Sequence, residues 1–450
     1  MVDRARLADL LARERAAYAD LHPRSAAAYG RAGNLFGGVP MTWMNKNAGG
    51  FPIYVDTAHG ARLTDVDGHG YVDFCLGDTA AMAGHAPGPV VAAVTERLSR
   101  QGGASTMLPT EDAAEVGAEL ARRFGVPRWS FTLTATDANR WAIRLLRAVT
   151  GRPRILVNSY CYHGSVDESL IVVGPDGTAQ SREGNVGAPY DVTATSRVAE
   201  YNDLAGLGRE LAHGDVAAVL MEPALTNIGI VLPEPGYLDG VRRLTRAFGV
   251  YLINDETHTF SAGPGGATAA WGLDPDVVTI GKAIGGGIPI GAYGLSAAIA
   301  DALLGRSDLD LVDMGGVGGT LAGNPLSTAA ARATLGEVLT DEAFAGMIEV
   351  ASGFASGVRT IVEDAGLPWS VNQLGARVEY RFVSPAPRTG GASAAAADAD
   401  LEDLLHLYLA NRGVLLTPFH NMALMCPRTT AADVARHHEV FAAAVDELTG

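Results

Sequence analysis

The stretch "YLDGVRRLTRAFGVYLINDE", residues 237–256, decides the fold of this 450-residue chain. It predicts an amphipathic helix that stops at Gly249, followed at once by an apolar strand. Upstream, "VAAVLMEP" (216–223) is a second apolar strand. The order strand, helix, strand predicts two parallel strands joined by a crossover helix.

The same alternation recurs nearer the start of the chain. A strand, "RWSFTLT" (128–134), precedes a helical stretch, "ANRWAIRLLRAVTG" (138–151), and a further strand, "RILVNSY" (154–160). These patterns predict an α/β fold with a mainly parallel sheet covered by helices. We assign it to a large domain, residues 71–330.

The two ends of the chain are predicted to form a smaller α+β domain. Residues 52–74 alternate apolar and polar side chains and turn at His59-Gly60 and Asp67-Gly68, which indicates a hairpin. We assign residues 1–70 and 331–450 to this domain. Within it, "SPAPRTGGASAAAADAD" (384–400) is predicted to be an exposed loop.

Composition excludes several classes of protein. The chain is 48% hydrophobic and 19% charged, and it has no apolar run long enough to cross a bilayer. A net charge of −16 argues against a nucleic-acid or acidic-membrane partner. The three cysteines have no metal-type spacing. We therefore expect reduced thiols, no metal site and a cytoplasmic protein.

Polar stretches follow the predicted strands at "TATDAN" (134–139), "SYCYHG" (159–164), "NDETH" (254–258) and "VVTIGK" (277–282). Ligands collect at the carboxyl ends of strands in open α/β sheets. Lys282 is followed by three glycines, 285–287, and small apolar residues. A desolvated lysine there loses its charge more easily and becomes a nucleophile toward carbonyls. With a strand-end acid such as Asp255 it forms the pair that pyridoxal phosphate (PLP) needs; the alternative is a surface lysine and an acid that meets water.

Longer motifs make a resemblance specific. They are "NDETHTFSAGPGGATAAWGLDPDVVTIGKAIGGGIPIGAYG" (254–294), "EPALTNIGIVLPEPGYL" (222–238) and "GGTLAGNPLSTAAA" (318–331). From about Gly37 to its end the chain resembles the class III aminotransferases, in the branch that contains glutamate-1-semialdehyde aminomutase and β-amino-acid aminotransferases. The resemblance implies a fold type I enzyme with PLP as cofactor. It also implies a homodimer with shared active sites.

The resemblance gives roles to residues around the cofactor ring. Lys282 would form the Schiff base with PLP and later move the proton between the substrate carbon and the cofactor. Asp255 would pair with the pyridinium nitrogen, and Tyr162 would stack on the ring, with a plain core tyrosine as the alternative. His163 is expected in a supporting place. Thr257 occupies the usual Val position behind the ring and adds a hydroxyl.

Further residues would complete the cofactor site. Glu222 and Asn227 resemble residues that line it. Thr134, Ala135 and Thr136 stand where the family usually has Ser-Gly-Thr before a helix, and hydroxyls with free N–H groups at a helix N-terminus favour a phosphate. A simple helix cap is the alternative. Thr320 resembles the threonine that reaches the phosphate of the neighbouring subunit.

The substrate region departs from relatives that bind carboxylates. Those relatives use arginines in two places, where this chain has Trp43 and Met44 in one and Phe419 with His420 in the other. Losing guanidinium groups removes bidentate carboxylate clamps. Asp78 would favour a substrate amino or hydroxyl group, or would neutralise Lys46 or Lys282.

The reaction predicted from these residues is transamination. We expect amino-group transfer from a hydrophobic amine or amino compound to a keto acid or aldehyde in a ping-pong scheme. The alternative is an intramolecular aminomutase of the glutamate-1-semialdehyde type. A non-catalytic relative would need the lysine or the aspartate to be lost, and neither is. A nicotinamide dehydrogenase is excluded because the glycine run follows Lys282 and opens no dinucleotide-binding unit.

Overall fold

The computed structural model describes residues 2–187, 190–312 and 314–450. They divide into a larger unit, residues 87–345 and 387–395, and a smaller unit, residues 1–86, 346–386 and 396–450. The divisions at 86/87 and 345/346 lie further along the chain than the predicted 70/71 and 330/331. The second of them falls inside one long helix, α11 (Asp341–Asp364).

The larger unit is built on a seven-stranded sheet with the order β4-β12-β11-β10-β9-β5-β8. Neighbouring strands run parallel, except that β12 is antiparallel to both β4 and β11. This arrangement confirms the predicted mainly parallel sheet. The strands are β4 (Arg128–Thr132), β5 (Arg154–Asn158), β8 (Ser196–Ala199), β9 (Val216–Met221), β10 (Tyr251–Asp255), β11 (Val277–Ile280) and β12 (Gly291–Leu295).

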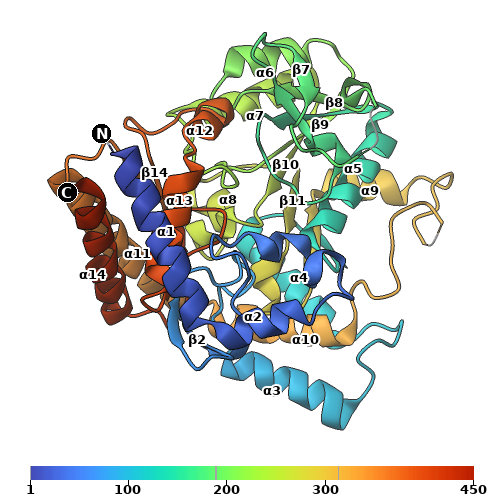
Figure 1. The fold of residues 1–450 in the computed structure, drawn as a ribbon. Coiled ribbons are helices and arrows are strands. Elements are labelled where there is room, and N and C mark those ends of the chain that lie inside the picture. The colour runs from blue at the N-terminus through green and yellow to red at the C-terminus, as the bar shows by residue number, and fades with distance from the viewer. Residues whose placement is uncertain (1, 188–189, 313) are drawn as a thin grey trace. The chain divides into compact units, whose positions relative to one another are not determined.

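Helices cover this sheet, and a short hairpin of β6 (Ile171–Val173) and β7 (Ala179–Ser181) is appended to it. The α5 helix packs on β9 to β12, and α7 packs on β10 (Figure 1). The helices of the unit are α3 (Gly88–Glu96), α4 (Glu111–Phe124), α5 (Ala135–Thr150), α6 (Leu204–Leu211), α7 (Tyr237–Phe248), α8 (Gly266–Ala270), α9 (Ala297–Leu304), α10 (Pro325–Ala333) and α12 (Gly390–Ala395).

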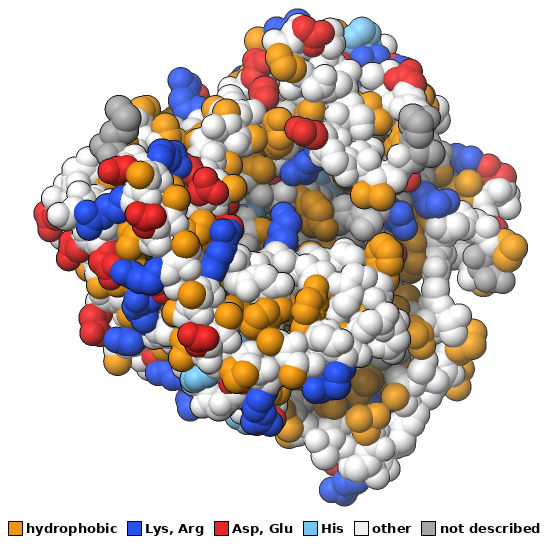
Figure 2. Space-filling model, viewed as in Figure 1, with side chains coloured by type: hydrophobic (Ala, Val, Ile, Leu, Met, Phe, Trp, Pro, Cys, Tyr) orange, Lys and Arg blue, Asp and Glu red, His pale blue; other side chains and the backbone are white. Residues whose placement is uncertain are grey.

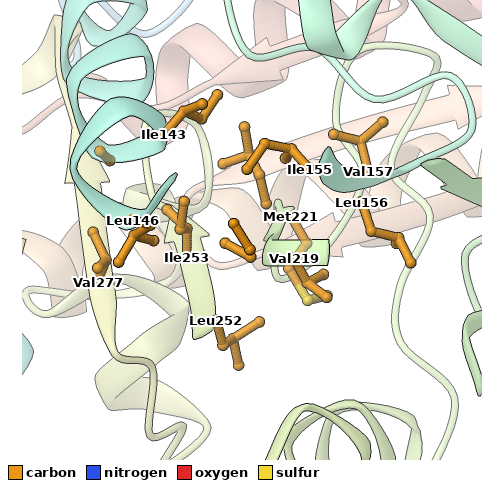
Figure 3. Close-up of a cluster of buried hydrophobic side chains, with 14 of the residues drawn as sticks. Ile143, Leu146, Ile155, Leu156, Val157, Val219, Met221, Leu252, Ile253 and Val277 are labelled. Carbon is orange, nitrogen blue, oxygen red and sulfur yellow. The ribbon is translucent and has the colours of Figure 1, made fainter. Parts of the chain in front are cut away.

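The core of the larger unit explains why these strands are apolar throughout. Ile143 and Leu146 of α5 meet side chains from β5, β9, β10 and β11, including Val219 and Ile253 (Figure 3). All six residues of β9 are buried. A strand that is covered on both faces cannot alternate with polar residues, which is why the sequence shows continuous apolar runs.

The α5 helix begins and ends at residues suited to those places. Thr134 is the N-cap, and its hydroxyl oxygen accepts a hydrogen bond from the backbone N–H of Asp137 at 3.1 Å. Gly151 ends the helix in the left-handed conformation, with φ of 67°. These caps fix the N-terminus of α5 at the carboxyl end of the sheet, where the predicted site lies.

The smaller unit contains two small sheets, with the orders β1-β2-β3-β15 and β13-β14-β16. The predicted hairpin region forms β1, β2 and β3. Its elements are α1 (Arg4–Leu21), α2 (Pro23–Gly30), β1 (Val55–His59), β2 (Arg62–Asp65), β3 (Gly70–Asp73), β13 (Ser370–Leu374), β14 (Arg377–Arg381), α13 (Ala399–Ala410), β15 (Val414–Leu415), β16 (Met422–Leu424) and α14 (Ala431–Thr449), together with most of α11.

The exposed loop predicted over 384–400 is wrong in part. Residues 387–395 belong to the larger unit, where they contain α12. Gly390 is buried against the residues that directly follow strand β5, and an added Cβ would lie 2.1 Å from the carbonyl oxygen of Ser159. The hydroxyl of Ser393 donates to the carbonyl of Ile228. Small residues allow this close docking, and the sequence pattern does not distinguish them from a flexible linker.

The surface carries charges of both signs. On the face drawn in Figure 2, Lys and Arg side chains are interspersed with Asp and Glu, and apolar side chains lie among them. Within the described residues, none of the helices combines the length and the apolar character that a bilayer span requires.

Candidate active site

Asp255 ends strand β10 and is the centre of a hydrogen-bonded network in the larger unit. Its Oδ2 accepts from Asn139 Nδ2 of α5 and from His163 Nδ1, each at 2.8 Å. Its Oδ1 accepts from the backbone N–H of Thr257 at 3.0 Å and from the Thr257 hydroxyl at 2.6 Å. The network holds the carboxylate in one orientation.

These contacts set the charge of the network. Burial alone would raise the pKa of Asp255, but the hydrogen bonds and charge of His163, with those of Thr257 and Asn139, hold that pKa below its ordinary value. Burial opposes the charge on His163 too, yet Cys161 and Asp255 raise the pKa of its imidazole well above the usual range. The site therefore contains a buried carboxylate that is held in its ionised form by its neighbours.

Asn139 was not predicted as a site residue. It is fully buried, and besides Asp255 it binds the hydroxyl of Thr279 at 2.6 Å through Oδ1. An asparagine on the apolar face of a helix was the only signal in the sequence.

Glu256 turns away from this network into the turn after β10. Its carboxylate accepts from the Thr259 hydroxyl at 2.6 Å and from the backbone N–H groups of Ala267 and Thr268, at 3.0 and 2.5 Å. Burial raises the pKa of Glu256 despite these donors. The second acid of the pair thus ties the turn to the N-terminus of α8.

Lys282 follows strand β11 in a strained conformation, with φ of 50°. A non-glycine residue in this region costs of order 1 kcal/mol and indicates a functional constraint. Its half-buried side chain ends at His258, with Nζ 2.8 Å from Nε2. His258 was not predicted as a site residue, and its position directly after the strand-end acids was the available signal.

The predicted phosphate residues lie at the N-terminus of α5. The Thr136 hydroxyl accepts from the backbone N–H of Ser165 at 3.2 Å, and the Thr134 hydroxyl donates to Asp137 at 2.9 Å. Ala135 is the first residue of the helix, so its backbone N–H lies among those that the helix leaves unbonded. The structure brings Thr134, Ala135 and Thr136 together, with Thr134 already occupied as the cap.

Tyr162 and Glu222 lie side by side at neighbouring strand ends. Glu222 Oε1 accepts from the backbone N–H of Tyr162 at 3.4 Å, and the Thr226 hydroxyl donates to Glu222 Oε2. Burial raises the pKa of Glu222. Tyr162 is 41% exposed. Asn227 follows on the same loop and is half-buried.

Thr320 is exposed and lines a depression of about 480 Å³ between residues 105–109 and 318–325. Nothing in this depression comes from the Asp255 network.

The five predicted substrate residues all belong to the smaller unit. Trp43 stands edge-on to Phe419, with ring centroids 6.1 Å apart, and Lys46 Nζ lies 5.7 Å from the Phe419 centroid. Met44 directly follows Trp43 in the sequence and is half-buried.

The other two substrate residues have internal partners. His420 Nδ1 lies 3.4 Å from Glu379 Oε1. Asp78 faces Arg377, at 3.9 Å, and not Lys46 as one interpretation of the sequence expected. Arg377 is fully buried, so the aspartate offsets its charge.

The residues of the larger unit fit PLP. Gly281 places backbone against α5, since an added Cβ would lie 2.9 Å from Ala135 N, and at Gly164 one would lie 2.0 Å from Thr136 Oγ1. The close approach keeps the helix N-terminus and the Lys282 turn together. A lysine, a carboxylate whose pKa is lowered, a partly exposed tyrosine and a helix N-terminus are the kinds of group that hold PLP.

Comparison with known proteins agrees with this geometry. The family model for class III aminotransferases matches residues 43–444. A lysine-to-alanine variant of a glutamate-1-semialdehyde-aminomutase from Pseudomonas aeruginosa PAO1, solved in complex with PMP, is 47% identical, with a TM-score of 0.96 over 99% of both chains. The glutamate-1-semialdehyde 2,1-aminomutase of Desulfitobacterium hafniense is 36% identical over 88% of this chain and 91% of its own length.

A β-phenylalanine aminotransferase from Variovorax paradoxus is more distant, at 26% identity and a TM-score of 0.86 over 97% of both chains. Sequence motifs, fold and site geometry agree. The chain belongs to the class III aminotransferase family.

Proposed function

We propose that this PLP-dependent enzyme exchanges an amino and an oxo group within one substrate, glutamate-1-semialdehyde or a close analogue. The observation that carries the proposal is the site at the sheet edge, with ionised Asp255 and half-buried Lys282 at the ends of adjacent parallel strands. The 47%-identical aminomutase over 99% of both chains supports this specific reaction. Transfer between two molecules, which the sequence favoured, becomes the second candidate.

When bound, PLP supplies an aldehyde that condenses with amines and a ring that accepts electrons from the substrate carbon. Asp255 would hold the protonated ring nitrogen, because its own charge is maintained by His163, Asn139 and Thr257. The N-terminus of α5, with the Thr136 hydroxyl, would hold the phosphate.

The remaining residues would contact the cofactor ring or transfer a proton on the substrate. Tyr162 would cover one face of the ring. Lys282 would bond to the aldehyde and, once released, carry the proton that moves on the substrate. The cofactor site would also be lined by Glu222 and Asn227. His163 would support the ring indirectly, through its hydrogen bond to Asp255.

A homodimer completes this proposal. Met107, Leu108, Val312 and Met314 are 82, 71, 93 and 83% exposed. Met107, Leu108 and Val312 line the depression that contains Thr320. Exposed apolar clusters mark protein interfaces. A second copy of the chain covering this surface would bring Thr320 to the phosphate of its partner.

The second candidate keeps the chemistry and changes the substrate. Transfer from a hydrophobic amine to a keto acid is favoured by the Trp43 and Phe419 pair, which stands where carboxylate-binding relatives have arginines. An aromatic pair with a single neighbouring lysine suits an apolar donor.

One assay separates the two candidates. The PLP-loaded full-length chain is given glutamate-1-semialdehyde without any keto acid, and separately a panel of hydrophobic amines with pyruvate or 2-oxoglutarate. Isomerisation of the semialdehyde with no acceptor supports the aminomutase. Turnover only in the presence of both an amine and a keto acid would contradict it and favour the transferase.

Borohydride reduction followed by peptide mass spectrometry tests the lysine. Position 282 should carry the cofactor in the native chain. The Lys46→Arg variant is the matched control, because Lys46 and Lys282 are the chain's two lysines. Cofactor trapped at Lys46 would refute the assignment of the site.

A further inference from the structure

The smaller unit contains a group of two histidines and one aspartate that the proposed function does not use. One ligand atom from each residue, His22 Nε2, Asp65 Oδ2 and His69 Nδ1, lies within 4.8 Å of the other two. His22 joins α1 to α2, and Asp65 and His69 flank the turn between β2 and β3. The cysteine spacing that argued against a metal site does not bear on this group, because the fold brings its members together.

The distances among these atoms suit a zinc ion. Asp65 Oδ2 lies 3.6 Å from His22 Nε2 and 3.2 Å from His69 Nδ1. Ligands that bind a tetrahedral zinc at about 2.0–2.1 Å lie about 3.3 Å from one another. Two imidazoles and a carboxylate are ligands that zinc accepts. The side chain of His69 is 37% exposed, so it has room to bring its nitrogen closer to that of His22.

The surroundings orient the two buried ligands. His22 Nδ1 lies 2.7 Å from the carbonyl oxygen of Tyr18, which can only accept, so Nδ1 carries the proton and Nε2 the lone pair. An N–H bond to a backbone carbonyl is a usual outer partner of a metal-binding histidine. Burial lowers the pKa of His22, which favours the neutral ring that a metal requires. Asp65 Oδ1 accepts from the backbone N–H of His69 at 2.8 Å, which fixes the carboxylate.

A shortage of protons beside these ligands indicates a bound cation. The Tyr71 hydroxyl lies 2.8 Å from His22 Nε2 and 2.7 Å from Asp65 Oδ2. It has one proton for these two acceptors, so one of the two short contacts brings lone pairs together. An unpaired buried acceptor destabilises the fold. A cation among the three ligand atoms removes the conflict, with the Tyr71 oxygen moving outward by about 0.5 Å to the fourth place.

A second set of bonds holds the two halves of this group together. Asp67, in the turn between β2 and β3, accepts from the backbone N–H groups of Arg24 and Ser25 at 2.6 and 3.0 Å. It also accepts from the Ser25 hydroxyl at 2.7 Å. These bonds fix the first turn of α2 against the β2–β3 turn, so the ligands are preorganised.

We propose that His22, Asp65 and His69 bind one zinc ion, which fastens the junction of α1 and α2 to the β2–β3 turn. The ion stabilises the smaller unit and takes no part in the proposed cofactor chemistry. Neither conclusion depends on the other.

Zinc titration of the PLP-loaded full-length chain tests the site. The chain carries no added histidine tag, is stripped of metal with a chelator, and is titrated with Zn²⁺ in competition with a chromophoric chelator. His69→Ala removes the half-exposed ligand. His59→Ala is the matched control, because His59 is an exposed histidine of the neighbouring strand β1.

We expect the native chain and His59→Ala each to bind one Zn²⁺ per chain. His69→Ala should bind it at least about 100-fold more weakly, since even an outer partner of a metal ligand contributes about 10- to 100-fold. Zinc should raise the melting temperature of the native chain and of His59→Ala, but not that of His69→Ala. X-ray absorption of the native chain with one equivalent of zinc should show two imidazole ligands.

Zinc affinity in His69→Ala equal to that of the native chain would overturn the proposal. A native chain that binds less than one zinc ion would overturn it too. If His69→Ala does not fold, X-ray absorption of the native chain decides, and fewer than two imidazoles around the zinc would refute the site.

Discussion

The hydroxyl of Thr257 donates to Asp255 Oδ1 at 2.6 Å. Valine, the residue expected at this position from the family resemblance, would occupy nearly the same volume but could not form this hydrogen bond. The contact makes the ionisation of Asp255 depend on a residue two positions along the chain.

The Thr257→Val substitution should therefore move the acid limb of PLP binding. The folded-state pKa of Asp255 lies below its ordinary value, so the stabilisation that its charge gives is present above that value and is lost as the pH falls through the folded-state pKa. Without the hydroxyl this pKa rises, and PLP release on acidification should begin at a higher pH than in the native chain. Absorbance of bound cofactor against pH measures the shift.

Thr259→Val is the matched control for that experiment. It removes a hydroxyl that donates to the Glu256 carboxylate at 2.6 Å and to the backbone carbonyl of Asp255 at 3.4 Å, and not to the Asp255 carboxylate. Its acid limb should coincide with that of the native chain, and an equal shift in both variants would show that the effect is not specific to Asp255.

The Glu256→Gln substitution should destabilise the fold. The amide offers one acceptor oxygen, and its NH₂ group would face one of the three donors that now bind the carboxylate. Leaving a buried donor unpaired should lower the free energy of unfolding by about 2 kcal/mol, measured by urea denaturation. Glu439→Gln, in an exposed ion pair with Arg436, should cost less than about 1 kcal/mol. Similar losses in the two variants would contradict the structural role of Glu256.

The Gly281→Ala substitution should weaken cofactor binding. The added Cβ would lie 2.9 Å from the backbone N of Ala135, so either the α5 N-terminus or the Lys282 turn must move. We expect at least a tenfold higher dissociation constant for PLP, measured by equilibrium titration, because a misplaced anion site loses one or more charge-assisted hydrogen bonds. Gly117→Ala, within α4, meets no atom within 4 Å and should leave binding unchanged. Undiminished affinity in Gly281→Ala would refute the assignment of the phosphate site.

The Met107→Glu substitution should separate the subunits. It places a charge in the exposed apolar cluster that surrounds Thr320, where a second chain would have to desolvate it. Light scattering at one concentration should show the proposed dimer for the native chain and a monomer for the variant. Val186→Glu, on another exposed position, should leave the dimer intact. A dimer that survives Met107→Glu would place the interface elsewhere.

The sheet could be predicted from the sequence, and so could the positions of Asp255 and Lys282 at its edge, because each follows from a local sequence pattern. Apolar runs that alternate with amphipathic helices indicate parallel strands, and Asp255 and Lys282 directly follow two of those strands. Asn139 and His258 were missed because their roles depend on which side chains the tertiary fold brings opposite them. Arg377 was missed as the partner of Asp78 for the same reason. The two residues are far apart in the sequence: Thr79, which follows Asp78, lies 298 positions before Arg377.

The sequence was also misleading in one segment rich in small residues, because such residues occur both in flexible linkers and in closely packed segments. The run that contains Gly390 and Ser393 has the composition of a linker, yet it docks closely because those residues are small. Composition alone does not separate these cases.

The two neighbouring acids at the end of β10 have different hydrogen-bond partners. Asp255 binds a network of side chains, and Glu256 binds the backbone at the start of helix α8. The turn should accordingly accept some exchanges of residue type but not a change in length. Deleting or inserting a single amino acid there would rotate both carboxylates out of their places at once, so variation among natural versions of this segment should consist of substitutions and not of gaps.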